Sequence, residues 1–219
     1  MPLPAKSSAQ TEKIMTAAAQ LFARQGYHGT STREIARLAD VSENTLFRHF
    51  DRKEDVFWSA LRTRCAAIKL RRDMVDGMRY GHAPEVVLPK IIEFLIDILH
   101  YSPDVLRLIA VAFLEMHSKA DEFCDEYLTP GFSAISKYFA ESARQGRVRD
   151  LDPAMVTAAL TTMVLAHPWF SRQAADERSG HPDRRAAEHA YTHFWLDVLR
   201  PRRLPGQREA PLASSMLRR

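Results

Sequence analysis

Apolar residues recur at intervals of three and four along most of this chain, which is the spacing of helices with one buried face. No long alternating run of β-branched residues appears, so a sheet is not expected. The pattern therefore predicts an all-α fold. The expected helices run from Thr11 to Gly26, as a pair within 30–50, and over 53–75, 85–101, 104–119, 130–145, 153–173 and 183–200, with Pro168 expected to kink or end its helix.

Residues 30–50 carry the most specific local pattern. Ser31 and Glu34 have the spacing of a capping box, in which side chains satisfy free backbone N–H groups at a helix start. Asp40 interrupts the helical pattern, and Ser42 is placed to cap a second helix. Two short helices joined by a tight turn form a helix-turn-helix, whose second helix fits the major groove of DNA.

Polar side chains lie where such a motif would contact DNA. The expected contacts are Ser31, Thr32 and Arg33 at the start of the first helix, Glu43, Asn44, Thr45, Arg48 and His49 on the second together with the apolar Phe47, and Lys53 at the start of the next. Backbone N–H groups at a helix start favour phosphate, and residues near the start of a recognition helix reach base edges. A generic helical hairpin with a solvated polar face would show the same residues, so this pattern alone leaves both interpretations open.

The charges are unevenly distributed along the chain. Residues 1–72 hold 13 Lys and Arg against 7 Asp and Glu, residues 73–200 hold 13 against 19, and residues 201–219 hold 5 against 1. A basic N-terminal segment thus coincides with the helix-turn-helix pattern, and an acidic body follows it. This polarity favours the approach of the N-terminal segment to DNA.

The helix-turn-helix pattern is part of a longer resemblance. Residues 10–60 resemble the DNA-binding domain of the TetR family of transcriptional repressors, through KIMTAAAQLFARQGYHGTS, then TLFRHF, then KEDVF. The rest of the chain is similar to the family in length and helical character. The resemblance implies a three-helix N-terminal head and a helical C-terminal domain for ligand binding and dimerisation. It also implies a homodimeric repressor that binds a palindromic operator in double-stranded DNA and is released by a small-molecule effector.

Three positions depart from the family pattern. Phe47 stands where tyrosine is usual, which keeps the packing and loses a hydroxyl that helps to bind phosphate. Asn44 stands where glycine is common, so its amide either hinders a close approach to DNA or reads a base. Arg52 stands where a small capping residue is typical, and Asp51 is expected to cap one residue earlier. The first two departures keep a second hypothesis open, a helical ligand-binding or adaptor protein that has lost specific DNA binding.

Composition and pattern divide the chain into five segments. The expected divisions are a flexible arm over 1–10, the helix-turn-helix domain over 11–55, a connecting helix over 56–76, an effector-binding and dimerisation domain over 77–200, and a flexible basic tail over 201–219. Two glycines and a proline make 77–84 the clearest boundary between the head and the body.

The body is expected to hold a ligand pocket and a dimer interface. Polar residues that interrupt apolar helical faces, with aromatic and Met neighbours, indicate a pocket formed by Phe113, Met116, His117, Met163 and His167. The last two helices resemble the family's dimerisation pair, which implies interface contacts by Met155, Ala159, Met163, Tyr191, Phe194, Trp195 and Val198. Both sets are also compatible with an ordinary intramolecular core.

The sequence offers little support for other chemistry. It contains no glycine-rich phosphate loop, no GxSxG motif and no nucleophile beside an evident base, so neither catalysis nor a cofactor is expected. His189 and His193 are one helical turn apart but lack a third ligand, so no metal site is expected. Cys65 and Cys124 do not make a disulfide framework. Because no apolar run is long enough to span a membrane, we expect a cytoplasmic protein without a membrane partner.

Overall fold

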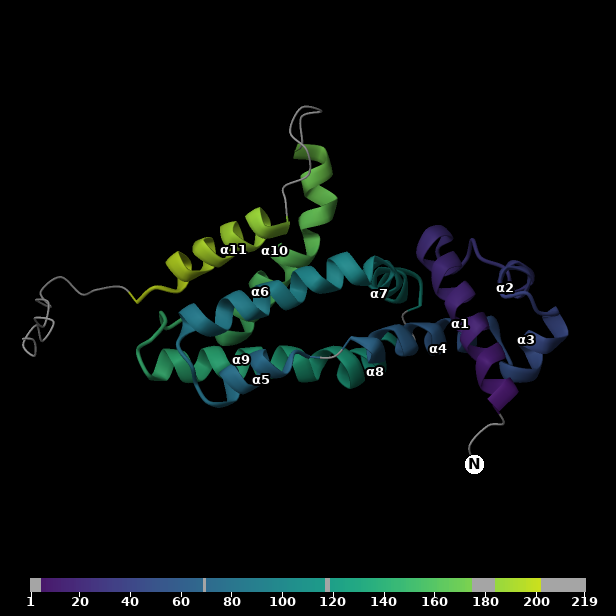
Figure 1. Cartoon of the computed structure of the whole chain (residues 1–219), viewed down its shortest axis with the longest axis horizontal. Helices are drawn as coiled ribbons and strands as arrows, with labels where there is room; N and C mark the ends of the chain where they lie inside the picture. Colours follow the sequence, from purple (N-terminus) through teal and green to yellow (C-terminus); the bar gives the residue numbers. More distant parts are fainter. Residues whose placement is uncertain (1–4, 69, 117–118, 175–183, 202–219) are drawn as a thin grey trace, which may run out of the picture.

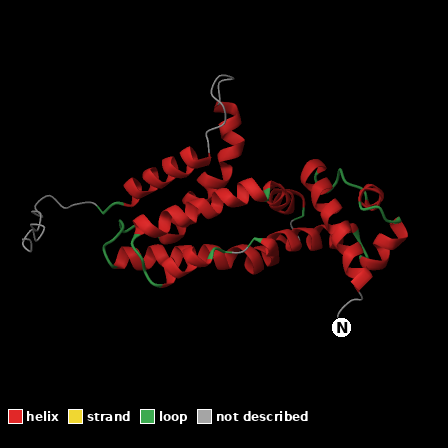
Figure 2. Cartoon of the chain, viewed as in Figure 1, coloured by secondary structure: helices red, strands yellow, loops and turns green. Residues whose placement is uncertain are grey.

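The computed structural model describes residues 5–68, 70–116, 119–174 and 184–201, and the side chains of 9–68, 70–116, 119–167 and 184–201. Every regular element in these ranges is helical, as the sequence pattern predicts (Figure 2). The helices are α1 (Ala5–Gln25), α2 (Thr32–Leu38), α3 (Glu43–His49), α4 (Lys53–Ala67), α5 (Arg72–Arg79), α6 (Pro84–Tyr101), α7 (Pro103–Glu115), α8 (Ala120–Phe123), the π-helical η2 (Cys124–Leu128), α9 (Thr129–Arg144), α10 (Pro153–Ala174) and α11 (Arg184–Leu199). None of the described helices combines the length and the apolar character needed to cross a membrane.

The helices α1 to α4 form a head at one end of the molecule, on the right of Figure 1. The helix α1 packs against α2 and α4, and α2 packs against α3. Ile14, Phe22, Ile35, Leu46 and Phe57 are fully buried where these helices meet. The rings of Phe22 and Phe57 meet edge to face, with centroids 5.2 Å apart, which is a favoured aromatic geometry.

The core of the head extends into the helices that follow α6. Leu108 and Ala112 of α7 and Phe123 of α8 are buried in the same apolar cluster as the head residues. The ring of Phe123 lies 6.0 Å from that of Trp58, which is on α4. The head and the body therefore share one continuous core on this side, and α7 packs directly against α1.

A second apolar cluster forms the core of the body around α6. This helix contacts α5, α7, α10 and α11, and α9 packs against α10 on the other side. Leu88, Ile91 and Ile92 of α6 are fully buried in this cluster with Leu160 of α10, and Phe139 of α9 is 2 % exposed. Figure 1 shows α6 and α9 running along the body, with α11 alongside α6.

Charged side chains join three helices on one face of the body. Arg71, just before α5, lies 2.7 Å from Glu93 of α6, and Arg184 at the start of α11 lies 2.7 Å from Asp97 of α6. Arg184 also pairs with Glu188 one turn along α11, at 2.7 Å. Partly exposed pairs of this kind contribute little individually, but this network fixes where α5 and α11 begin relative to α6.

The helix expected over 53–75 is interrupted, and that prediction is wrong. The helix α4 ends at Ala67, Ile68 takes an extended conformation with ψ of 98°, and α5 begins at Arg72. The side chain of Ile68 packs against both the head cluster and the body cluster. This tertiary packing outweighs a local sequence that contains no helix breaker.

Several helix ends also differ from the expectations. The arm over 1–10 is helical from Ala5 onwards in its described part. The helix expected over 104–119 ends at Glu115, and the sequence pattern missed the two short elements α8 and η2. The helix α10 spans Pro153–Ala174, in agreement with the expected 153–173, and it does not end at Pro168. The tail beyond residue 201 lies outside the described residues.

The cap of α4 also differs from the expectation. Arg52, not Asp51, is the residue that precedes the helix. The carboxylate of Asp55 accepts a hydrogen bond from the backbone N–H of Arg52 at 3.1 Å, so the capping group comes from inside the first turn.

The buried face of α6 provides a test of the body core. We expect Leu88→Ala to lower the free energy of unfolding by about 2–5 kcal/mol, because it leaves a cavity at a fully buried site. Val86 lies on the same helix and is 46 % exposed, so Val86→Ala is the matched control and should cost under about 1 kcal/mol. Urea unfolding followed by circular dichroism measures both, and equal costs would contradict the assigned core.

Candidate functional site

The two short helices of the head begin at the expected caps. The Ser31 hydroxyl accepts a hydrogen bond from the Glu34 N–H at 3.2 Å, and the Glu34 carboxylate accepts one from the Ser31 N–H at 2.9 Å. The bond from the backbone of Ser31, followed by that from its hydroxyl, lowers the pKa of Glu34 below its ordinary value. The Ser42 hydroxyl accepts from the Thr45 N–H at 3.1 Å. The capping box and the second cap are therefore confirmed.

The turn between α2 and α3 has a fixed geometry. Asp40 has a φ of 56°, in the left-handed region that aspartate tolerates better than most residues, and the Val41 N–H donates to the Ala36 carbonyl at 3.0 Å. The Thr32 hydroxyl at the start of α2 donates to the Glu43 carboxylate at the start of α3, at 2.6 Å. This bond links the two helices and holds α3 in one orientation.

The expected DNA contacts divide into two groups in the structure. Ser31, Arg33, Asn44, Phe47 and Arg48 are exposed, and Thr32, Glu43, Thr45, His49 and Lys53 are half-buried. Phe47 is apolar and yet 45 % exposed, so it lies on the surface of the head and not in its core. The half-buried residues make contacts within the head, as His49 does through its Nδ1 atom, 3.4 Å from the Thr11 hydroxyl.

Lys53 has an internal role that the sequence did not reveal. Its ammonium donates to the carbonyl oxygens of Tyr27 and Thr30, at 2.9 and 3.0 Å, and lies 4.2 Å from the centre of the Tyr27 ring. These contacts tie the start of α4 to the loop between α1 and α2. At most one of the three ammonium N–H donors is left for an external group.

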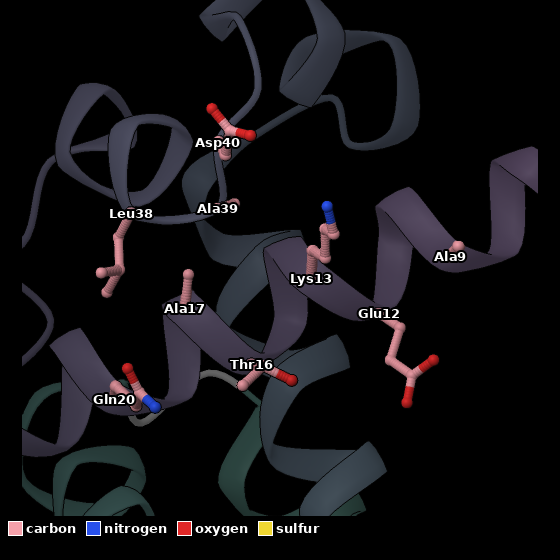
Figure 3. A pocket seen from close by; sticks show the side chains of 9 residues that line it. All are labelled: Ala9, Glu12, Lys13, Thr16, Ala17, Gln20, Leu38, Ala39 and Asp40. Atoms are coloured by element: carbon pink, nitrogen blue, oxygen red, sulfur yellow. The ribbon is translucent and has the colours of Figure 1, made fainter.

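A surface hollow of about 590 Å³ lies beside the head, between α1 and the end of α2 (Figure 3). Ala17 and Ala39 form its buried floor, and the exposed side chains of Lys13, Leu38 and Asp40 surround it. None of the expected DNA contacts lines this hollow. It therefore lies apart from the surface that α3 exposes.

A second, more apolar cavity of about 340 Å³ lies in the body next to the head. Its lining comes from the end of α4, the link to α5, α6, α7, η2, α9 and α10, and it includes Ile68, Phe94, Ile109, Phe132 and Leu165. The volume falls within the usual range for sites that bind small molecules. Because α4 and α7 both line the cavity and both pack against α1, a molecule bound there would touch the helices that support the head.

The polar groups of this cavity are few and neutral or acidic. Burial raises the pKa of the Cys65 thiol to about 12, so it is protonated. The Thr161 hydroxyl donates to the Thr157 carbonyl at 2.8 Å. Glu126 is exposed, with its carboxylate 3.5 Å from Arg62 Nε. No Lys, Arg or His is among the described side chains that line the cavity.

None of the described residues expected to line a pocket lines this cavity. Phe113 is 43 % exposed, Met116 is buried in the head cluster, and Met163 packs against the body cluster. His167 Nδ1 lies 2.6 Å from the Tyr191 hydroxyl, and burial lowers the pKa of this imidazole, which favours its neutral form. His117 lies outside the described residues. The cavity joins segments far apart in the sequence, and no local pattern indicated its lining.

The expected interface residues are only partly exposed on α10 and α11. Met155, Ala159 and Phe194 are exposed, Met155 by 67 % and Phe194 by 51 %, whereas Met163, Tyr191 and Val198 are half-buried. Trp195 is 5 % exposed and packs into the body cluster, so the expectation that it faces another chain is corrected. Its apolar neighbours hold α11 in place within its own chain.

The two histidines considered as a metal pair lie close together on α11. The ring centres of His189 and His193 are 4.1 Å apart. Among the side chains that the structure describes, no three His, Cys, Asp or Glu residues are grouped so that they could hold a metal ion.

Comparisons with known proteins agree with this architecture. The family model for bacterial regulatory proteins of the tetR family matches residues 14–60. The transcriptional regulator RutR of Escherichia coli K12 is 28 % identical over 150 residues, which cover 67 % of this chain and 68 % of RutR.

Solved structures show the same fold. A tetR-family regulatory protein from Rhodococcus RHA1 superposes with a TM-score of 0.69 at 15 % identity, covering 89 % of this chain and 98 % of that protein. AibR in complex with isovaleryl coenzyme A and operator DNA superposes with a TM-score of 0.64 at 18 % identity, covering 88 % and 98 %.

The matched segment contains α2, α3 and their caps, and the superpositions extend over the helical body. The head of this chain therefore matches the helix-turn-helix domain of tetR-family regulators, and its helical body has the fold of solved members of that family.

Proposed function

We propose that this protein is a cytoplasmic repressor that binds a palindromic operator as a homodimer and is released by a small apolar effector. The observation that carries the proposal is the head, in which two capped helices are fixed to each other and α3 exposes Asn44, Phe47 and Arg48. A rigid α3 with exposed polar side chains suits base reading, which needs donors and acceptors held at fixed positions.

The proposed DNA contacts differ in their roles. Arg48 is exposed on α3, where a guanidinium can contact either guanine or phosphate. Asn44 is exposed in the first turn of α3, where its amide suits adenine. Arg33 is exposed at the start of α2 and suits phosphate. Phe47 offers packing against the sugar-phosphate backbone without the hydrogen bond of a tyrosine.

The proposed homodimer uses the outer face of α10 and α11. Met155, Ala159 and Thr162 are exposed along α10, and Ala190 and Phe194 are exposed along α11. Small residues permit close helix packing, and the exposed Met155 and Phe194 are large apolar side chains that are costly to leave in water. Two heads in one dimer would read half-sites separated by about 34–36 Å, or by a multiple of that distance.

The proposed effector binds in the 340 Å³ cavity of the body. Its described lining lacks a basic side chain and is mostly aliphatic and aromatic, which favours a neutral or cationic apolar molecule over an organic anion. The related regulator AibR has been crystallised with isovaleryl coenzyme A, which carries phosphates, so this chain would differ from AibR in effector class. Occupation of the cavity would separate α4 from α7 and move the head.

Selection of duplexes from a random-sequence pool tests the proposed DNA binding. We expect the recovered sites to be palindromic, with an affinity that falls steeply as salt rises, because phosphate contacts release counterions. Asn44→Ala should cost about 1–3 kcal/mol and relax specificity at one base pair, whereas Arg33→Ala should weaken binding to all sequences. Failure to enrich any site would favour the alternative, a ligand-binding or adaptor protein without DNA specificity.

A substitution at Lys53 tests whether this residue binds a DNA phosphate or only supports the structure of the head. Because two of its donors bond backbone carbonyls, we expect Lys53→Met to lower the free energy of unfolding by about 1–3 kcal/mol. The salt dependence of DNA binding should stay close to that of the wild type. Arg33→Ala is the control, and the opposite result is expected for it. Its free energy of unfolding should be unchanged, and the slope of log binding constant against log salt concentration should fall in magnitude by about 1. If Lys53→Met instead reduced the dependence of DNA affinity on salt concentration, Lys53 would be identified as a phosphate contact.

Gly131 provides a test of the cavity. It lines the cavity, and apart from its chain neighbours and the backbone of its own helix no atom lies within 4 Å of the position that a Cβ would take there. We expect the neutral fluorophore N-phenyl-1-naphthylamine to bind the wild type and raise its melting temperature, since a ligand of the folded state stabilises it. Gly131→Leu should fill the cavity and lower that affinity at least roughly tenfold, and Gly131→Ala is the control for the backbone change. Unchanged binding to Gly131→Leu would place the fluorophore elsewhere.

A further inference from the structure

A carboxylate of the body is bonded directly to the loop that follows α1 in the head. The Oε2 atom of Glu115 accepts hydrogen bonds from the backbone N–H groups of Tyr27 and His28, at 2.9 and 3.1 Å. Glu115 is the last residue of α7, and it lies 88 and 87 positions along the chain from its two partners. Hydrogen bonds to a charged acceptor are stronger than those between neutral groups.

The loop is shaped to receive this carboxylate. Gly26 has a φ of +75°, and a Cβ at this position would lie 2.6 Å from Glu115 Oε1. Glycine therefore meets two requirements at once, the left-handed backbone and the close approach of the Glu115 side chain. The other side of the same loop is held by Lys53, which bonds the Tyr27 and Thr30 carbonyls.

This loop leads directly into α2, which is bonded to the recognition helix α3. Thr30 is followed by the cap Ser31, and Thr32 in the first turn of α2 bonds Glu43 at the start of α3. A displacement of the loop would therefore move α2 and, through the Thr32–Glu43 bond, α3.

The same helix that carries Glu115 lines the cavity of the body. Val105, Leu106 and Ile109 of α7 are part of the cavity lining, and Glu115 lies six residues beyond Ile109, about 9 Å along a rigid helix. Contacts made in the cavity therefore act on a helix whose last side chain is bonded to the head.

We propose that Glu115 is a positioning residue that fixes the head on the body and transmits the state of the cavity to α3 through α7. The inference rests on the proposed repressor function, and it assigns the coupling to a specific pair of hydrogen bonds. Loss of these bonds leaves the apolar packing of α7 and α8 as the remaining restraint, so each head samples a wider range of orientations. A dimer then holds its two heads in register for a smaller fraction of the time, and its affinity for two linked half-sites falls.

Four variants test this role on the full-length chain. Glu115→Ala removes the acceptor, Glu115→Asp shortens the side chain by one methylene, and Glu115→Gln keeps an oxygen that accepts hydrogen bonds. Asp121→Asn is the matched control, because it removes one negative charge from an exposed position on the neighbouring α8. The probes are a selected duplex with two half-sites, a duplex with one half-site, and a duplex of random sequence.

We expect Glu115→Ala and Glu115→Asp to weaken binding to the two-half-site duplex roughly tenfold, the effect of one or two lost hydrogen bonds. Glu115→Gln should restore most of the affinity, and Asp121→Asn should match the wild type. Binding to the single half-site should be the same for all variants. The inference would be overturned if Glu115→Ala bound the two-half-site duplex with wild-type affinity. It would also be overturned if the variant lost as much affinity for the single-half-site duplex as for the two-half-site duplex. If the wild type itself does not prefer two half-sites, the proposed function fails, whatever Glu115 does.

Amide hydrogen exchange tests the coupling without DNA. We expect the N–H groups of Tyr27 and His28 to exchange roughly tenfold faster in Glu115→Ala, while the buried amides of α1 stay protected. In the wild type, saturation with N-phenyl-1-naphthylamine should change the exchange of these two amides, and in Gly131→Leu it should not. Unchanged exchange in Glu115→Ala, or in the wild type with its cavity filled, would overturn the proposal.

Discussion

Apolar side chains of α7 and α8 close the core of the head, and most of the architecture follows from this packing. Leu108, Ala112 and Phe123 are buried in the same cluster as head residues such as Phe57 and Trp58, so the core of the head is completed by the body. A head supported in this way cannot rotate without exposing apolar surface, which costs about 25 cal/mol for each Å². Its orientation is therefore set by the body, which is a requirement for any regulator that acts through the head.

The cavity and the head are close enough to share structural elements. The end of α4 and the middle of α7 line the cavity, and the same two helices pack against α1. The proposed regulation would thus need no long pathway, since about two turns of α7 separate Ile109 in the cavity lining from Glu115 at the head. The break after Ala67 contributes to this arrangement, because Ile68 leaves the helix and packs against both apolar clusters.

The sequence predicted those features whose causes are local. The caps Ser31, Glu34 and Ser42 act within three residues, so their spacing was sufficient to place α2 and α3. The break after α4, the burial of Trp195 and the cavity lining depend on contacts between segments far apart in the chain. Glu115 shows the same limitation, because an isolated glutamate at a helix end carries no local sign of partners 87 and 88 residues away.

The buried thiol of the cavity has a consequence for how its lining would react with oxidants. Thiolates, not thiols, react rapidly with peroxides, and burial raises the pKa of Cys65 to about 12. Burial and the nearby Asp121 and Asp125 also raise the pKa of Cys124. Both cysteines are therefore protonated at neutral pH and slow to oxidise. The effector proposed for the cavity would therefore meet an uncharged thiol at Cys65, which peroxides oxidise only slowly.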